Sequence, residues 1–170
     1  MRQKTKKLCY VALSAAVLCI ISPWAIPIWG FPVTLSLFAV LLVSSILPTR
    51  LALASVLCYV ALGAVGIPVF AGFVGGFQVL AGPTGGFIIG YIPVALIVSL
   101  FRKKPVKRLI SMVFSTILCY IFGALWLFIS TGAHFIPTFG AVILTCALPD
   151  AIKIFSASLL ASALGTRITA

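Results

Sequence analysis

The charged residues of the chain leave three long stretches without any Lys, Arg, Asp or Glu. These stretches are residues 8–49, 51–101 and 109–149. A membrane-spanning helix needs about 20 mostly apolar residues, so each stretch can hold two spans and a bend, or one span with additional apolar structure. Only 8% of the 170 residues are charged, whereas soluble domains carry about a quarter. The sequence therefore predicts an integral membrane protein.

Breaks rich in Pro and Gly, together with short basic clusters, divide the apolar sequence into helices. We expect an all-α bundle that forms a single membrane domain over residues 1–170, with six spans at 8–22, 32–48, 51–65, 83–101, 109–131 and 149–166. The basic N-terminus superficially resembles a signal peptide. Because no Ala-x-Ala cleavage site is evident before Arg50, we interpret it as a retained first helix.

The positions of the basic residues predict the orientation of the bundle. They lie in RQKTKK (2–7), at Arg50, in RKKPVKR (102–108) and at Arg167. With the N-terminus inside the cell, eleven of the twelve Lys and Arg residues fall on the cytoplasmic side, in agreement with the positive-inside rule. We predict a multi-pass protein of the cell membrane, embedded in the lipid bilayer, with both termini cytoplasmic. The same clustering argues against nucleic acid as the partner of this basic chain.

The stretch 132–148 allows two interpretations. It can begin a long, kinked last helix, or it can form a short apolar segment on the outer side. Pro149 favours the second, because proline is tolerated at the first position of a helix and disrupts helix interiors. Asp150 would then lie in the first helical turn, where the helix dipole favours an anion.

The segment LPDAIK (148–153) combines two exceptional residues. Asp150 is the only acidic residue of the chain, and Lys153 is the only basic residue outside the cytoplasmic clusters. Residues three apart share a helix face, and ionisable groups within a membrane usually face a bundle interior or a watery cavity. We interpret the pair as part of a ligand site that opens to the outer side. The alternative is a buried ion pair that only fixes helix packing.

A glycine-rich stretch, residues 63–87, separates the third and fourth predicted spans on the outer side. Glycine allows close approach of the backbone, and irregular backbone at membrane depth is tolerated where it lines a cavity. The alternative is a flexible connector. The apolar side chains of this stretch, which include Phe70 and Phe77, argue that it packs. Gln78 is its only amide side chain and is a candidate to hydrogen-bond a ligand.

Catalytic and metal chemistry are disfavoured by the composition. One Asp and one His, His134, offer little for acid–base catalysis, so we predict no enzyme, no catalytic residue and no metal site. The fragment AGPTGG (81–86) lacks the lysine of a phosphate-binding loop, so ATP-driven work needs a partner.

The cysteines show no CxxC spacing, and we interpret them as small apolar side chains; they are Cys9, Cys19, Cys58, Cys119 and Cys146.

Two small residues in the first predicted helix, Ala12 and Ala16, form an AxxxA pair. Small residues four apart allow two membrane helices to approach closely. The pattern fits contact with a partner protein, and it fits equally well with packing inside the same bundle.

Several of these segments together resemble the BioY family, the biotin-binding S components of energy-coupling factor (ECF) transporters. The resemblance covers nearly the whole chain, and the segments that carry it are FPVTL (31–35), GIPVFAG (66–72), GG (75–76), GPTGGF (82–87) and PDAIK (149–153). The last segment is one glycine shorter than the P-G-D-x-x-K type of ending in the family. Phe87 stands where the family usually has Tyr.

The resemblance implies a six-helix bundle that captures biotin from outside. It implies that Asp150 and Lys153 contribute to the biotin site. It also implies that the glycine-rich loop closes over the site through Gly72, Gly75 and Gly76. Phe73 and Gln78 of the same loop complete the predicted ligand contacts. No cofactor is implied, since biotin is the ligand.

The resemblance also implies protein partners. Ala12 and Ala16 would contact the transmembrane coupling subunit of the ECF transporter. Two ATP-binding cassette ATPases would then drive a tilting of the S component that releases biotin inside. Two alternatives stay open, namely an S component for another vitamin or a biotin precursor, and a stand-alone secondary transporter.

The expected pocket departs from the family at two positions. Val74 stands where relatives often have a small polar residue, and Ser36 stands where Gln is common. Both reduce the hydrogen-bonding capacity, for which Gln78 is the candidate to compensate. The candidate walls for the bicyclic ring of biotin are aromatic, with interfacial anchoring as the alternative for the two tryptophans; they are Trp24, Trp29, Phe73 and Phe77.

Overall fold

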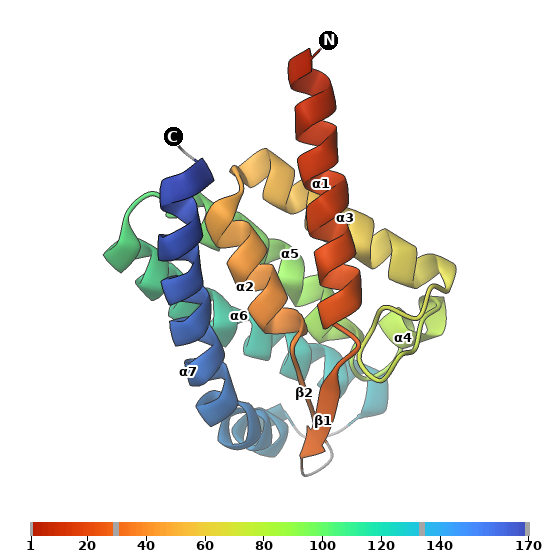
Figure 1. Cartoon of the computed structure of the whole chain (residues 1–170). Helices are drawn as coiled ribbons and strands as arrows, with labels where there is room; N and C mark the ends of the chain where they lie inside the picture. The colour runs from red at the N-terminus through yellow and green to blue at the C-terminus, as the bar shows by residue number, and fades with distance from the viewer. Residues whose placement is uncertain (1, 29–30, 133–134, 169–170) are drawn as a thin grey trace.

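The computed structural model of the chain describes residues 2–28, 31–132 and 135–168. Trp29 and His134, which were singled out above, lie outside these ranges. The described residues form a bundle of helices with one two-stranded hairpin (Figure 1). The elements are α1 (Arg2–Ile21), β1 (Ala25–Ile28), β2 (Phe31–Thr34), α2 (Ser36–Ile46), α3 (Thr49–Val65), α4 (Phe77–Ala81), α5 (Gly85–Leu100), α6 (Pro105–Thr131) and α7 (Phe135–Ile168).

Each of the six predicted spans overlaps one of the six longer helices. By length and apolar composition, two described helices can cross a membrane, namely α6 and the part of α7 from Phe139 to Leu164. The other apolar helices are shorter, with 11 residues in α2, 17 in α3 and 16 in α5. Short helices are compatible with a bilayer when flanking residues, local thinning or oligomerisation cover the mismatch.

The predicted all-α fold is wrong between Ala25 and Thr34, where the chain forms an antiparallel hairpin. Ala25 pairs with Thr34, and Pro27 pairs with Pro32. Each strand therefore holds a proline, which would remove a hydrogen-bond donor from a helix. The neighbouring β-branched residues favour extended backbone. As a result the second long helix begins at Ser36 instead of at residue 32.

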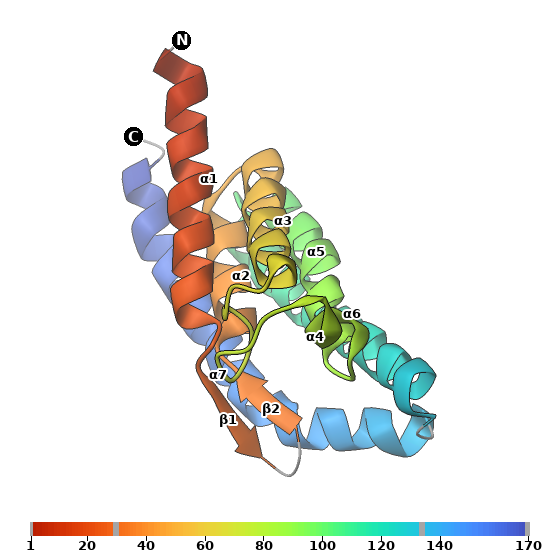
Figure 2. The ribbon, with the colours of Figure 1, turned by 90° about the vertical axis from the view of Figure 1, so that its right-hand side faces the viewer.

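Of the two interpretations of 132–148, the structure has the first, a long and kinked last helix, and not the one that Pro149 favoured. Helix α7 already begins at Phe135, so Pro149 lies inside it and Asp150 is not in its first turn. A proline inside a helix removes one backbone hydrogen bond and bends the axis. Figure 2 shows this change of direction, with the first part of α7 lying across the end of the bundle and its later part running along α2.

Small residues allow α5 and α6 to pack closely. A Cβ atom at Gly86 would overlap the Trp126 side chain and lie 2.7 Å from the carbonyl oxygen of Phe122, and a Cβ atom at Gly123 would overlap the Phe87 ring. Both glycines therefore form contacts that alanine would prevent. The GPTGG segment thus contributes a packing glycine at the start of α5.

Candidate ligand-binding site

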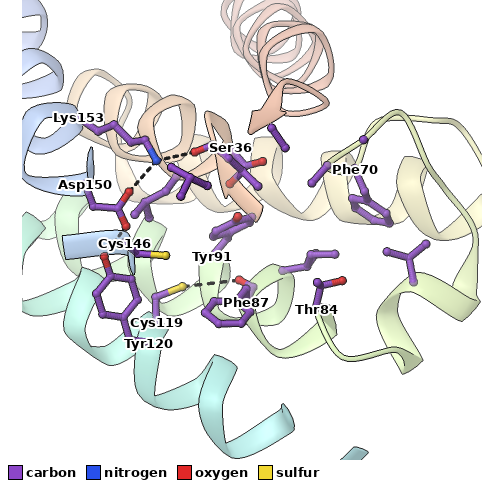
Figure 3. A pocket seen from close by; sticks show the side chains of 18 of the residues that line it. Ser36, Phe70, Thr84, Phe87, Tyr91, Cys119, Tyr120, Cys146, Asp150 and Lys153 are labelled. Carbon is purple, nitrogen blue, oxygen red and sulfur yellow. Dashed lines mark hydrogen bonds and ion pairs between the residues drawn. The ribbon is translucent and has the colours of Figure 1, made fainter. Parts of the chain in front are cut away.

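A cavity of about 290 Å³ lies between the hairpin, the glycine-rich loop and helices α2, α3, α4, α5, α6 and α7. Its wall is predominantly apolar and aromatic, with a charged pair at one end (Figure 3). The lining residues are Ala25, Val33, Thr34, Ser36, Leu37, Tyr59, Phe70, Ala71, Gly72, Val74, Val79, Thr84, Phe87, Ile88, Tyr91, Cys119, Tyr120, Cys146, Asp150 and Lys153.

The charged end of the cavity is a connected set of hydrogen bonds. Lys153 Nζ donates to Asp150 Oδ1 over 2.6 Å and to the carbonyl oxygen of Thr34 over 2.7 Å. The Tyr120 hydroxyl donates to the other carboxylate oxygen, Asp150 Oδ2. Asp150 is 5% exposed and Lys153 is 8% exposed. Burial of charges is tolerated when they are paired and hydrogen-bonded, and this arrangement meets both conditions.

Three elements hold these groups together. The i, i+3 spacing on α7 directs Asp150 and Lys153 to the same side, as predicted. Helix α6 contributes Tyr120, and the end of β2 contributes the main-chain carbonyl of Thr34. Along α7, Ala157 and Ala161 are almost completely buried, so these small residues allow close packing below the ion pair.

The opposite part of the cavity is built from aromatic rings. Tyr59 of α3 and Phe70 of the glycine-rich loop meet edge to face, with ring centroids 5.7 Å apart. The Tyr59 hydroxyl donates to the Val69 carbonyl over 3.3 Å, so this bond ties the loop to the helix. Phe87 and Tyr91 line the wall from α5. Such a surface suits an apolar ring or chain rather than a charged group.

The glycine-rich loop packs against the bundle, which argues against a flexible connector. Gly72 lines the cavity, and its N–H donates to the Pro23 carbonyl over 2.9 Å. Its φ of +80° and the φ of +106° at Gly76 are values that other residues rarely adopt. A Cβ atom at Gly75 would collide with the backbone of Ile67. The loop therefore depends on glycine for its path.

Only part of the predicted loop contacts reaches the cavity in this structure. Gly72 is on the wall, whereas Phe73, Gly75, Gly76 and Gln78 are not among its lining residues. The Gln78 amide instead lies against Gly76. A ligand-binding role for these four residues stays a prediction.

The proposed aromatic walls lie elsewhere. Trp24, Phe73 and Phe77 are more than half exposed, and none of them lines the cavity. Trp24 and Phe73 pack edge to face with centroids 5.6 Å apart, which joins the hairpin to the loop. The two positions that depart from the family, Ser36 and Val74, do line the cavity. The Ser36 hydroxyl donates to the Ser22 carbonyl over 3.1 Å.

Sequence reasoning did not find Tyr120, Tyr91 or the carbonyl of Thr34. Tyr120 lies 30 residues before Asp150, in a stretch without any charge or motif. The available signal was weak: the polar residue Thr116 and the small residue Gly123 share its helix face, which is typical of a buried face in a membrane bundle. A main-chain carbonyl such as that of Thr34 has no signature in sequence.

The AxxxA pair is separate from the cavity. Ala12 and Ala16 lie on an exposed face of α1, whereas Ala15 and Leu18 are buried against the bundle. Packing inside the same bundle therefore does not account for the pair. The exposed position leaves room for a helix of another protein.

The fold and the cavity define a class of protein, a helical membrane protein with a mostly apolar cavity that carries a charged pair at one end. A family model described as the BioY family matches residues 1–170. The chain belongs to the BioY family.

Individual relatives resemble most of the chain. The biotin transporter BioY2 of Lactococcus lactis subsp. cremoris (strain MG1363) is 39% identical over 131 residues, which cover 74% of this chain and 72% of that protein. The probable biotin transporter BioY of Pyrococcus horikoshii is 35% identical over 161 residues, which cover 95% of this chain and 97% of that protein.

A solved structure has the same fold. It is a crystal structure of the S-component for biotin from an ECF-type ABC transporter, with a TM-score of 0.88 and 24% sequence identity. The match covers 96% of this chain and 92% of that one. The overall fold of this chain is therefore one already seen in a solved protein.

Proposed function

We propose that this chain is the substrate-binding membrane subunit of an ECF-type importer and captures biotin from the outer side. The observation that carries the proposal is the buried Tyr120–Asp150–Lys153 cluster at one end of an otherwise apolar cavity. Biotin has the matching chemistry, because its ureido group is polar while its ring and alkyl chain are apolar. The cavity volume of about 290 Å³ is near the lower end of small-molecule pockets, about 300–1,000 Å³, which suits a ligand of vitamin size.

The proposed topology has six membrane-crossing helices and cytoplasmic termini. The two ends of the chain, the turn before Arg50 and the connection from α5 to α6 lie at one end of the bundle (Figure 1). The basic clusters therefore lie toward one end, which supports a cytoplasmic face there under the positive-inside rule. The cavity and the hairpin lie toward the other end, which would face outward in the cell membrane.

Transport would be completed by partner proteins. The proposed partners are an ECF transmembrane coupling subunit, which would contact α1 at Ala12 and Ala16, and two ATP-binding cassette ATPases. As a member of a family of biotin transporters, the chain is not an enzyme. The proposed ligand is biotin, and the mechanism needs no cofactor in this subunit.

The proposal is tested by purifying the protein in detergent and measuring bound biotin by mass spectrometry and titration. Asp150→Asn should weaken biotin binding by about 10-fold or more, since a hydrogen bond to a charged group contributes about 1.5–3 kcal/mol. Ser156→Ala is the matched control on α7, because the Ser156 hydroxyl bonds only to carbonyls of its own helix, those of Ile152 and Lys153.

Three results would contradict the proposal in different ways. Equal biotin affinity of Asp150→Asn and the parent would show that Asp150 does not contribute to biotin binding. Displacement of biotin by thiamine, riboflavin or a biotin precursor at lower concentrations would identify an S component for another compound. Uptake by the chain alone in proteoliposomes, driven by an ion gradient without any ATPase, would favour a secondary transporter.

A further inference from the structure

The hydrogen bond from Tyr120 to Asp150 gives α6 a direct connection to the ligand-binding end of the cavity. Tyr120 is 6% exposed, lines the cavity and donates its hydroxyl hydrogen to Asp150 Oδ2. Lys153 occupies the other carboxylate oxygen. The carboxylate of Asp150 is therefore held from two helices at once, and its rotation about the side-chain bonds is restricted (Figure 3).

The same bonds determine what this cluster can offer a ligand. A tyrosine hydroxyl has a single hydrogen, so once it is donated to Asp150 the Tyr120 oxygen can only accept. An ammonium group has three hydrogens, and Lys153 uses two of them on Asp150 and Thr34. The cluster can therefore offer a ligand one charged N–H donor, from Lys153, and several oxygen lone pairs as acceptors.

The formal charges favour a neutral ligand group at this position. Lys153 and Asp150 carry opposite charges and form a close pair. A ligand carboxylate placed against them would leave one uncompensated negative charge in a buried site, which is costly. A urea or amide edge has N–H donors next to a carbonyl acceptor and matches the remaining capacity without adding charge.

We propose that Tyr120 is a specificity-determining positioning residue, which holds the Asp150 carboxylate so that the cluster accepts the ureido edge of the ligand and leaves its carboxylate to another part of the site. This inference rests on the proposed function, because it assumes that biotin is the ligand. Without the Tyr120 hydroxyl, Asp150 Oδ2 loses its donor and the carboxylate turns toward Lys153 or water. The cluster then presents a less defined set of donors and acceptors.

The test compares three ligands on the detergent-purified parent and Tyr120→Phe proteins. These are biotin, 2-iminobiotin, a cyclic guanidine in which a nitrogen that carries hydrogen replaces the ureido oxygen, and biotin methyl ester, in which the charged carboxylate is converted to a neutral ester. Tyr120→Phe should lower the discrimination between biotin and 2-iminobiotin by about 10-fold, the size expected for one charge-assisted hydrogen bond. The affinity ratio of biotin to its methyl ester should stay within about twofold, a change below the effect of one hydrogen bond.

Thr116→Val is the matched control variant. Thr116 is buried on the same helix one turn before Tyr120, does not line the cavity, and donates its hydroxyl only to the Met112 carbonyl. It should leave both ratios unchanged. If Tyr120→Phe does not yield folded protein, Tyr120→Met removes the same hydroxyl with a flexible apolar side chain and takes its place.

Equal weakening of all three ligands, or no change in either ratio, would overturn the proposal, since a merely structural tyrosine does not distinguish ligand groups. A change confined to the methyl ester ratio would overturn the assignment of the ureido edge. These outcomes are distinct from failure of the proposed function, in which the parent protein would not bind biotin at all.

Discussion

The ammonium group of Lys153 is buried inside the bundle. This is possible only because two oxygen atoms accept hydrogen bonds from it. Its Nζ atom lies 2.6 Å from Asp150 Oδ1 and 2.7 Å from the Thr34 carbonyl oxygen. Removing one member of a buried ion pair leaves the other charge without compensation, and the cost commonly exceeds what the pair itself contributes. The two residues are therefore expected to be coupled in stability as well as in binding.

Lys153→Met should reduce the free energy of unfolding by about 3–5 kcal/mol, because it leaves the Asp150 charge unpaired. Adding Asp150→Asn should recover a large part of this loss, since no buried charge remains. The measurement is denaturant unfolding of the detergent-solubilised protein without biotin. Lys107→Met, at an exposed lysine of α6, is the control and should change stability by less than about 0.5 kcal/mol. Equal effects of the two lysine substitutions on the free energy of unfolding would show that the buried Asp150 charge does not need Lys153 as its partner.

At the level of single residues, the sequence predicted the two charged residues of the cavity and missed its uncharged polar groups. Asp150 and Lys153 are detectable because charges are rare in such a chain. Tyr120 and Tyr91 are aromatic residues in a sequence that is 63% hydrophobic, so nothing local distinguishes them from lipid-facing or core residues. Their place at the cavity depends on how α5 and α6 pack, which is a tertiary property.

Proline explains why each of the six predicted spans overlaps a helix but differs from it in its boundaries. Pro105 begins α6, as sequence rules suggest, whereas Pro93 and Pro149 lie inside α5 and α7. Interior prolines are tolerated in membrane helices because neighbouring groups satisfy the freed backbone atoms. Local sequence does not contain these neighbours. The bend at Pro149 and the hairpin around Pro27 could therefore not be predicted from the proline positions alone.

Gly86→Ala should destabilise the protein by about 1–3 kcal/mol, because the added methyl group overpacks the contact between α5 and α6. The Phe122 carbonyl oxygen, 2.7 Å from the added atom, is backbone and cannot rotate away. Gly140→Ala is the matched control in α7, where the added atom meets nothing within 4 Å; it should be neutral or stabilise by up to about 1 kcal/mol. Thermal unfolding in detergent measures both. If the two variants have the same unfolding temperature, close packing at Gly86 does not limit the stability of the protein.

The whole molecule separates its polar features along its long direction. The basic clusters gather with the two chain ends, and the cavity lies with the hairpin and the glycine-rich loop toward the other end (Figure 1). The charge pattern of the sequence was sufficient to predict this separation. It was not sufficient to predict the hairpin, whose contact with α7 through Thr34 and Lys153 joins residues 119 positions apart.

Helix α1 is the element that we propose connects this architecture to energy-driven transport. It buries Ala15 and Leu18 against the bundle and leaves Ala12 and Ala16 exposed. A protein that only bound biotin would gain nothing from small residues on an exposed helix face. A face that receives a partner helix needs them, because larger side chains would hold the backbones apart. Binding and transport should therefore be separable by substitution on α1.

The double substitution Ala12→Leu and Ala16→Leu should leave biotin affinity in detergent unchanged, because neither residue lines the cavity. In proteoliposomes that also contain the coupling subunit and the two ATPases, the same variant should reduce ATP-dependent biotin uptake to the level measured without ATP. Ala147→Leu is the matched control, at an exposed alanine on α7, and should retain uptake. Normal uptake by the α1 variant would place the coupling surface elsewhere. Loss of biotin binding by the α1 variant would instead show that α1 packing reaches the cavity, and binding and coupling would then not be independent properties of this fold.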